Sequence, residues 1–359
     1  MKTVGTIFAA AGLLAGARNW MIGPFARPAE GNPVIQPREE STFLCPVRRQ
    51  PVHWEALHTF NPAAVVRNGK IYVLYRAEDD TGTMMIGGHT SRIGLAESTD
   101  GIHFTRRAEP VLFPADDDQR EREWPGGCED PRIAEAEDGT YVLTYTQWNL
   151  KSTDAAIATS PDLVHWTKHG PMLAKAHGGK YLNLGYKSAG IVQRRTGDKL
   201  IAAKIDGAYW MYWGEGAIHL ARSTNLIDWD PLEDKNGQLV NVLKPRPGKF
   251  DSSFPESGPP PVLTDRGIVV VYNGKNSSDP QLAKDTYAAG QALFDAKDPS
   301  HLLERGSEPF FKPELPFERS GQYTAGTTFT EGLVHYGSSW FLYYGCADSL
   351  VGVAMAKDD

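Results

Sequence analysis

The chain repeats one short pattern, first seen in Asn68-Gly69-Lys70-Ile71-Tyr72-Val73-Leu74-Tyr75, where a turn-forming pair precedes alternating aromatic and β-branched residues. A turn pair followed by such an alternating run is typical of a hairpin strand. Four further segments share the pattern, at residues 138–145, 197–203, 265–272 and 336–344. The sequence therefore predicts five similar β units in one chain.

A second pattern follows most of these segments. A short run of small and apolar residues leads through a turn to an aromatic residue, as in residues 93–104, 156–166 and 218–229. The spacing of about 60 to 70 residues leaves room for four short strands in each unit. No amphipathic helical stretch recurs between the strands, which argues against an α/β fold. We predict an all-β, five-bladed β-propeller. A large β-sandwich is the alternative, but it has no need of five similar units.

Blades of a propeller converge on a central channel, where ligands bind. Functional residues are therefore expected from several units instead of from one local motif. Composition excludes other classes of protein: the net charge of −7 and the scattered basic pairs argue against nucleic acid as a partner.

Metal and cofactor motifs are also missing from the sequence. Cys45, Cys128 and Cys346 form no Cys-x-x-Cys pair, and the ten histidines show no metal-ligand spacing. There is no P-loop and no Gly-x-Ser-x-Gly elbow. We predict no metal and no cofactor.

The N-terminus resembles a secretory signal. Lys2 precedes an apolar stretch at residues 4–17 that ends in small residues, as signal peptides do. Residues 1–17 are thus predicted to direct the protein to the periplasm or the exterior, and residues 18–359 to form one catalytic domain. Alternatively, residues 1–17 form a helix that packs on the domain or mediates homo-oligomerisation, and the protein is cytoplasmic. No stretch reaches the length of a membrane span.

Three carboxylates lie on restrained loops of different units. Asp130 follows a Gly/Pro-rich turn, Glu215 lies between two glycines, and Glu256 lies in a proline-rich segment. Such carboxylates, with aromatic side chains to stack on sugar rings, are typical of a glycosidase, which needs an acid and a base. Alternatively, Asp130 caps an Asx turn, and the glutamates pair with nearby lysine or arginine. The aromatic candidates are Trp124, Trp210, Trp213 and Tyr323.

Several further motifs occur in a fixed order along the chain. They include Asn61-Pro62, Tyr75-Arg76-Ala77-Glu78-Asp79, Glu129-Asp130-Pro131-Arg132, Gly258-Pro259-Pro260-Pro261 and Tyr344-Gly345-Cys346-Ala347-Asp348. In this combination the chain resembles the inverting mannoside phosphorylases and mannosidases of glycoside hydrolase family 130.

The resemblance implies a five-bladed propeller that cleaves β-mannosides with inversion. Asp130 matches the family's general acid, which passes its proton through the 3-hydroxyl of the substrate. A salt bridge between Arg132 and Glu129 is the alternative for Arg132. The resemblance further implies these substrate-binding residues: Asn61, Arg76, Asp79, Arg132, Lys187, Asn273 and Asp348.

The nucleophile separates the two branches of this family. The phosphorylases usually carry His in a Tyr-His-Gly motif, whereas this chain has Tyr272-Asn273-Gly274. Glu215 and Glu256 look like the acidic pair of the hydrolytic branch, and two carboxylates would repel a phosphate. We therefore predict that both glutamates hold an attacking water. The resemblance to the hydrolytic branch implies that the substrate is a β-1,2-linked mannoside, from which mannose is released. Which of the two is the base stays open.

Two other functions remain as alternatives. A mannoside phosphorylase would bind phosphate through Arg132, Lys187 and Lys275. A non-catalytic glycan-binding propeller would keep the aromatic residues and arginines and would not need restrained carboxylates.

Overall fold

The computed structural model describes residues 20–358, which are all-β apart from three short helical turns. The all-β part of the predicted fold class is thereby confirmed. The predicted signal at residues 1–17 lies outside the described residues. Within the described part of the chain, no helix is long and apolar enough to cross a membrane. The helical turns are α1 (Arg120–Glu123), η1 (Ala176–Gly179) and η2 (Pro316–Glu318).

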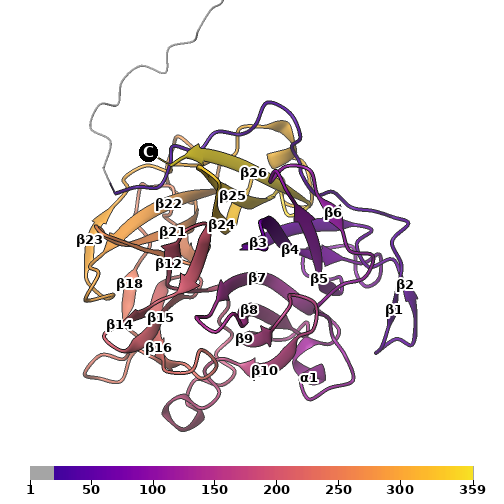
Figure 1. Ribbon diagram of the computed structural model, residues 1–359, viewed down its shortest axis with the longest axis horizontal. Coiled ribbons are helices and arrows are strands. Elements are labelled where there is room, and N and C mark those ends of the chain that lie inside the picture. The colour runs from indigo at the N-terminus through magenta and orange to yellow at the C-terminus, as the bar shows by residue number, and fades with distance from the viewer. Residues whose placement is uncertain (1–19, 359) are drawn as a thin grey trace, which may run out of the picture.

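Five antiparallel strand groups follow one another along the chain and are arranged around a centre (Figure 1). The first contains β3 (His58–Arg67), β4 (Lys70–Glu78), β5 (Ser91–Ser98) and β6 (Thr105–Arg106). The second contains β7 (Gly127–Glu135), β8 (Tyr141–Trp148), β9 (Thr153–Ser160) and β10 (Thr167–Pro171). The third is built from β11 (Ala189–Ile191), β15 (Ala208–Trp213) and β16 (Ile218–Ser223), edged by β14 (Lys204–Ile205), β17 (Asp230–Pro231) and β18 (Asn241–Leu243).

In the fourth group, β19 (Phe254–Ser257) and β20 (Val262–Thr264) both pair with β21 (Gly267–Lys275), followed by β22 (Tyr287–Phe294) and β23 (Leu302–Arg305). The fifth contains β24 (Thr328–Tyr336), β25 (Ser339–Cys346) and β26 (Leu350–Lys357). Two hairpins lie beside these groups: β1 (Phe43–Cys45) with β2 (Gln50–Val52), and β12 (Gln193–Thr196) with β13 (Lys199–Ala202).

Four of the five repeated sequence segments form the second strand of a group, namely β4, β8, β21 and β25. Residues 197–203 also form the predicted hairpin strand, but outside the five groups. They lie in the β12–β13 hairpin, and β13 pairs in parallel with β7. In the third group β15 takes this position, because its alternating aromatic residues pair with β11 on one side and β16 on the other.

Apolar residues fill the space between successive groups. One cluster joins Leu74 and Ile93 of the first group to Leu143 of the second. Similar clusters join the second group to the third, the third to the fourth, and the fourth to the fifth. Another packs Val73 of the first group against Phe341 of the fifth. Burial of apolar surface between neighbouring groups is therefore what holds them together.

A buried tyrosine on the second strand recurs with an acidic partner that lies outside the strands. The hydroxyl of Tyr272 donates to Asp251 at 2.8 Å, and the Asp251 carboxylate in turn pairs with Arg246 at 2.7 Å. Three other groups repeat this arrangement with the pairs Tyr75–Glu55, Tyr145–Glu123 and Tyr344–Glu318. Each buried hydroxyl thus has a charged acceptor, and each acid has a basic partner.

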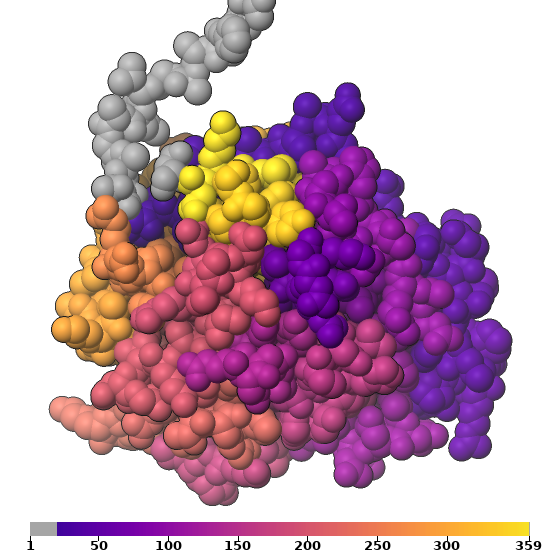
Figure 2. Space-filling model, viewed as in Figure 1, coloured from indigo at the N-terminus to yellow at the C-terminus, as the bar shows by residue number. Residues whose placement is uncertain are grey.

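The first described segment adds a strand-like edge to the fifth group. Ala26 exchanges backbone hydrogen bonds with Met355 of β26, and Ile35 forms a bridge with Val351. Asn32 supports this contact, since its side-chain amide donates to the carbonyl of Val353 and accepts from its N–H, both at 2.9 Å. The two ends of the described chain therefore lie side by side (Figure 2).

Candidate active site

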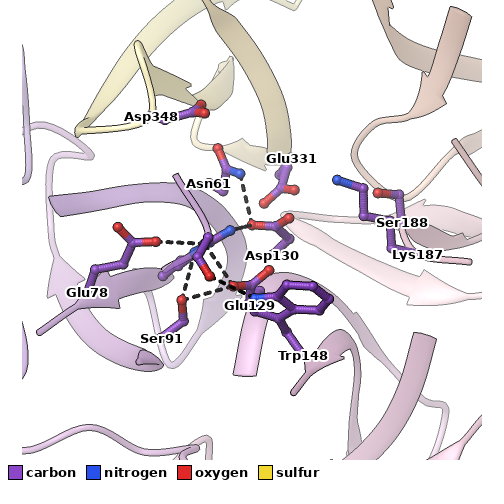
Figure 3. Close-up of polar contacts among 12 residues, drawn as sticks. Asn61, Glu78, Ser91, Glu129, Asp130, Trp148, Lys187, Ser188, Glu331 and Asp348 are labelled. Carbon is purple, nitrogen blue, oxygen red and sulfur yellow. Dashed lines mark hydrogen bonds and ion pairs between the residues drawn. The ribbon is translucent and has the colours of Figure 1, made fainter. Parts of the chain in front are cut away.

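In three of the groups, the first strand contains an extra residue near the centre. Relative to their partner strands, β3 bulges at Asn61, β7 at Asp130-Pro131 and β24 at Glu331. Asn61 and Asp130 both have φ of 47°, a left-handed conformation that costs energy for a residue with a side chain. A bulge redirects the side chain of the extra residue, and Figure 3 shows that these three side chains gather at one place.

Asp130 lies at the centre of these side chains. Its Oδ1 accepts from Asn61 Nδ2 at 2.9 Å and from Arg76 Nη1 at 3.2 Å (Figure 3). Arg76 also pairs with Glu78 at 2.7 Å and with Glu129 at 2.8 Å. A glycine at position 345 makes room for this arrangement, because a Cβ there would lie 2.2 Å from Asn61 Oδ1. Asp130 is therefore a buried carboxylate held in one orientation.

Glu129 and Asp130 differ in their affinity for a proton. Burial raises the pKa of Glu129 to about 7, against the opposing charge of Arg76. Burial would raise the pKa of Asp130 as well, but the charges of Arg76, Lys187 and Arg132 and the bond from Asn61 hold it below its ordinary value. Near neutral pH a proton on this neighbouring pair therefore lies on Glu129, whereas Asp130 is ionised.

Arg132 lies beneath Asp130 and ties three groups of strands together. It donates to the carbonyls of Asp130, Ser257 and Gly258, and its Nη1 lies 2.8 Å from Glu331 Oε1. The alternative salt bridge to Glu129 is thus not formed, since Glu129 pairs with Arg76. Burial raises the pKa of Glu331 well above its ordinary range.

Glu256 and Glu215 lie next to each other, because their backbones form a β-bridge. Lys187 Nζ lies 3.6 Å from Glu256 Oε1 and 3.7 Å from Glu215 Oε2, and Ser188 Oγ donates to Glu256 Oε1 at 2.5 Å. Burial and the charge of Glu215 raise the pKa of Glu256 to about 7, against the opposing charge of Lys187. Glu256 Oε2 is buried and has no hydrogen-bond partner among the described residues.

A cavity of about 250 Å³ opens over these side chains. Its lining includes six of the residues predicted from the sequence: Asn61, Arg76, Asp130, Lys187, Glu256 and Asp348. Burial raises the pKa of Asp348 to about 7. The fold therefore brings together four carboxylates: an acidic pair on β7, a third on β19 and a fourth on the β25–β26 turn.

Four predicted residues do not line this cavity. Glu215 lies 3.7 Å from Lys187 with its side chain partly exposed, and Arg132 is buried. Asp79 pairs with Arg92 at 2.7 Å. Asn273 is occupied by the backbone and hydroxyl of Thr330. Each of these four side chains therefore has a polar or charged partner within the protein.

The aromatic lining differs from the prediction. Of the four candidates, only Tyr323 lines the cavity, whereas Trp213 is fully buried in the core. Trp148, Tyr287, Phe60 and Phe329 line it instead. The sequence reasoning also missed Glu331. A carboxylate inside the otherwise uncharged run Thr328-Phe-Thr-Glu-Gly-Leu-Val334 of a buried strand is the signal that could have found it.

Three potential metal ligands lie together outside the cavity. The ligand atoms of His58, Glu78 and His89 are all within 4.8 Å of one another. Their spacing in the sequence does not indicate a metal motif, because a strand pairing and a loop bring them together.

Comparison with known proteins identifies relatives along nearly the whole chain. A family model described as β-1,4-mannooligosaccharide phosphorylase, glycoside hydrolase family 130, matches residues 30–359. A 1,2-β-oligomannan phosphorylase of Thermoanaerobacter sp. (strain X514) is 31% identical over 329 residues, which are 90% of this chain and 95% of the relative.

Solved structures include relatives of higher identity. A putative glycosidase from Bacteroides thetaiotaomicron is 53% identical with a TM-score of 0.92, covering 93% of this chain and 96% of its own. Another structure is 52% identical with a TM-score of 0.93, and the match covers 95% of this chain and 98% of its own. It is reported with the finding that the GH130 family of mannoside phosphorylases contains glycoside hydrolases that target β-1,2 mannosidic linkages in Candida mannan.

Proposed function

The chain belongs to glycoside hydrolase family 130, and we propose that it hydrolyses β-1,2-linked mannosides, releasing mannose with inversion at the anomeric carbon. The observation that carries this proposal is the buried Glu256 of the cavity wall, with its unpartnered oxygen and a pKa near neutrality. A carboxylate of this kind can take a proton from water at neutral pH.

In the proposed reaction, Glu256 removes a proton from water as the water oxygen bonds to the anomeric carbon. The glycosidic bond breaks on the other side of the sugar, and the leaving oxygen receives, by way of Asp130, the proton that Glu129 holds. Asn61 and Arg76 hold Asp130 in place. The aromatic rings of Trp148 and Tyr287 provide apolar surface for the sugars.

The charges around the cavity favour water over phosphate as the nucleophile. Arg76, Arg132 and Lys187 each lie within 4.0 Å of at least one carboxylate. Lys275, the other cation that the phosphorylase alternative would use, lies 3.6 Å from Asp285. A phosphate would therefore have to compete with these carboxylates for the cations, and nearby Glu256 and Glu215 would repel it.

Phosphorolysis is the second candidate, because the relative from Thermoanaerobacter is a 1,2-β-oligomannan phosphorylase. The solved relative at 52% identity, whose description concerns hydrolases of β-1,2 mannosidic linkages, favours hydrolysis. We further infer that the five strand groups are the blades of one closed propeller, whose first strands β3, β7, β11, β19 and β24 surround the centre.

Incubation with β-1,2-mannobiose, with and without inorganic phosphate, tests the proposal. We expect free mannose, formed first as the α-anomer in a proton NMR time course, at a rate that does not change with phosphate. The Asp130→Asn variant serves as the control for contaminating activity. Mannose 1-phosphate formed only with phosphate would replace hydrolysis by phosphorolysis, and binding without turnover would indicate a glycan-binding protein.

A further inference from the structure

We propose that His58, Glu78 and His89 form a binding site for a divalent transition-metal ion of the zinc type, separate from the sugar cavity. Their ligand atoms all lie within 4.8 Å of one another, and none of the three residues lines the cavity. The inference does not depend on the proposed reaction, because it concerns only the binding of an ion.

Strand pairing brings two of the ligands together. His58 at the start of β3 lies directly opposite Glu78 at the end of β4. Directly opposed residues of an antiparallel pair carry their side chains on the same face. Glu78 is in turn opposite Ser91 of β5, and His89 lies two residues before that strand. Three neighbouring backbone segments therefore supply one ligand each.

Outer contacts orient the two imidazoles as metal ligands require. The Nδ1 of His89 lies 3.0 Å from the carbonyl oxygen of Thr81, which can only accept, so that Nδ1 carries the proton. The Nε2 of His89 then has a free lone pair. The Nδ1 of His58 contacts Ser349 Oγ at 3.0 Å, so Nε2 is the nitrogen of this ring that could bind an ion. A histidine whose other nitrogen is bonded to an outer group is the usual form of a metal ligand.

Glu78 retains ligand capacity despite its protein partners. Its Oε1 accepts from Arg76 at 2.7 Å and its Oε2 accepts from Gln322 Nε2 at 3.1 Å. Each carboxylate oxygen has two acceptor positions, so that one remains on each. Arg76 would repel a cation, but it is itself paired with Glu129 and Asp130 as well as with Glu78.

The ligand types indicate the class of ion. Two imidazoles and one carboxylate suit Zn²⁺ or Co²⁺, whereas Mg²⁺ and Ca²⁺ prefer oxygen ligands alone. Three protein ligands leave a fourth position for water. Tetrahedral zinc places its ligand atoms ~3.3 Å apart, so the three side chains would draw together on binding. His58 is partly exposed, which gives the ion a route from solvent to the buried Glu78 and His89.

Zinc binding to the full chain, purified without a histidine tag and stripped with a chelator, tests the proposal. Calorimetric titration with zinc should show one bound ion per chain. Titration with Co²⁺ should give visible absorption bands of a four-coordinate nitrogen and oxygen site. We expect His89→Ala and His58→Asn to weaken zinc binding by about 100-fold or more, since each removes a ligand.

The exposed His165 of the second group provides the matched control, because His165→Ala removes an imidazole far from the three ligands in the sequence. His58→Asn keeps the test valid if His89→Ala does not fold, and the near-ultraviolet circular dichroism of each variant checks its fold. The proposal is overturned if the folded wild-type chain binds no zinc or cobalt, or if both variants bind zinc as tightly as His165→Ala does.

Discussion

Glu215 and Glu256 are equivalent candidates for the base in the sequence, but the structure separates them. The Glu256 side chain is buried and lines the cavity, whereas that of Glu215 is 37% exposed and is not part of the cavity lining. Lys187 lies between the two carboxylates and contacts both. We therefore assign the removal of the proton to Glu256, with Glu215 and Lys187 adjusting its pKa in opposite directions.

This assignment predicts the pH dependence of the reaction. Glu256 must be deprotonated to act as a base, so kcat/KM should rise as the pH passes through about 7. The Glu129–Asp130 pair must hold a proton, and Glu129 loses its own at about 7, so kcat/KM should fall at higher pH. A bell-shaped profile with its maximum near neutral pH is expected from initial rates on β-1,2-mannobiose.

Variants of the two neighbours should move the acidic limb of this profile in opposite directions. Glu215→Gln removes a negative charge, so the limb should move to lower pH, and Lys187→Met removes a positive charge, so it should move to higher pH. Glu256→Gln should lower kcat by roughly 10²- to 10⁴-fold. Equal losses of kcat in Glu215→Gln and Glu256→Gln, with no movement of the limb, would contradict the assignment.

At the scale of strands and turns, the sequence predicts regular features better than irregular ones. Alternation and turn pairs correctly located β4, β8, β21 and β25, because each of these strands has one period throughout. The bulges at Asn61, Asp130 and Glu331 carry no such signal, since one extra residue is defined only against the partner strand. The sequence therefore indicates that Asp130 is important without showing what surrounds it.

The resemblance of motifs had a similar limit. It located six residues of the cavity lining, but it also included Asp79 and Asn273, whose partners lie within the protein. Residues that hold the site and residues that line it occur in the same motifs. Only the three-dimensional contacts distinguish the two.

The recurring tyrosine and acid pairs predict a measurable contribution to stability. In Tyr272→Phe, Asp251 would lose a buried donor at 2.8 Å, and Arg305 and Arg246 would lose an acceptor. Leaving buried charged groups short of a partner costs about 2 kcal/mol in the free energy of unfolding. Urea unfolding followed by circular dichroism measures this cost.

Tyr336→Phe is the matched control for that measurement, since the Tyr336 hydroxyl forms its hydrogen bonds in exposed surroundings. Its effect on the free energy of unfolding should stay below about 0.5 kcal/mol. Equal losses in the two variants would show that the buried acid does not set the cost.

At the scale of the whole molecule, the stability of the fold depends on contacts between the ends of the described chain. Residues 26–35 pair with β26, and apolar packing joins the fifth group to the first. Asn32 alone satisfies both backbone groups of the buried Val353. The N-terminal segment therefore functions as part of the fifth group, although it is the most distant from it in sequence.

Asn32→Ala should consequently weaken the entire fold and not just one edge of it. We expect a loss of about 1–3 kcal/mol in the free energy of unfolding, because two buried backbone groups of Val353 lose their partners. Thermal unfolding should remain a single transition with a lower midpoint. Asn236→Ala, in an exposed loop between β17 and β18, is the control, and an equally small effect of both substitutions would contradict this view.

The pairing of the first segment with the last strand also constrains synthesis on the ribosome. Residues 26–35 are translated long before their partner β26. Until β26 is made, the nascent chain exposes an unpaired edge, which is open to association with other chains. A nascent chain that ends before Asp348 also lacks part of the cavity lining, so the cavity and the closing strand pair are completed within a few residues of each other.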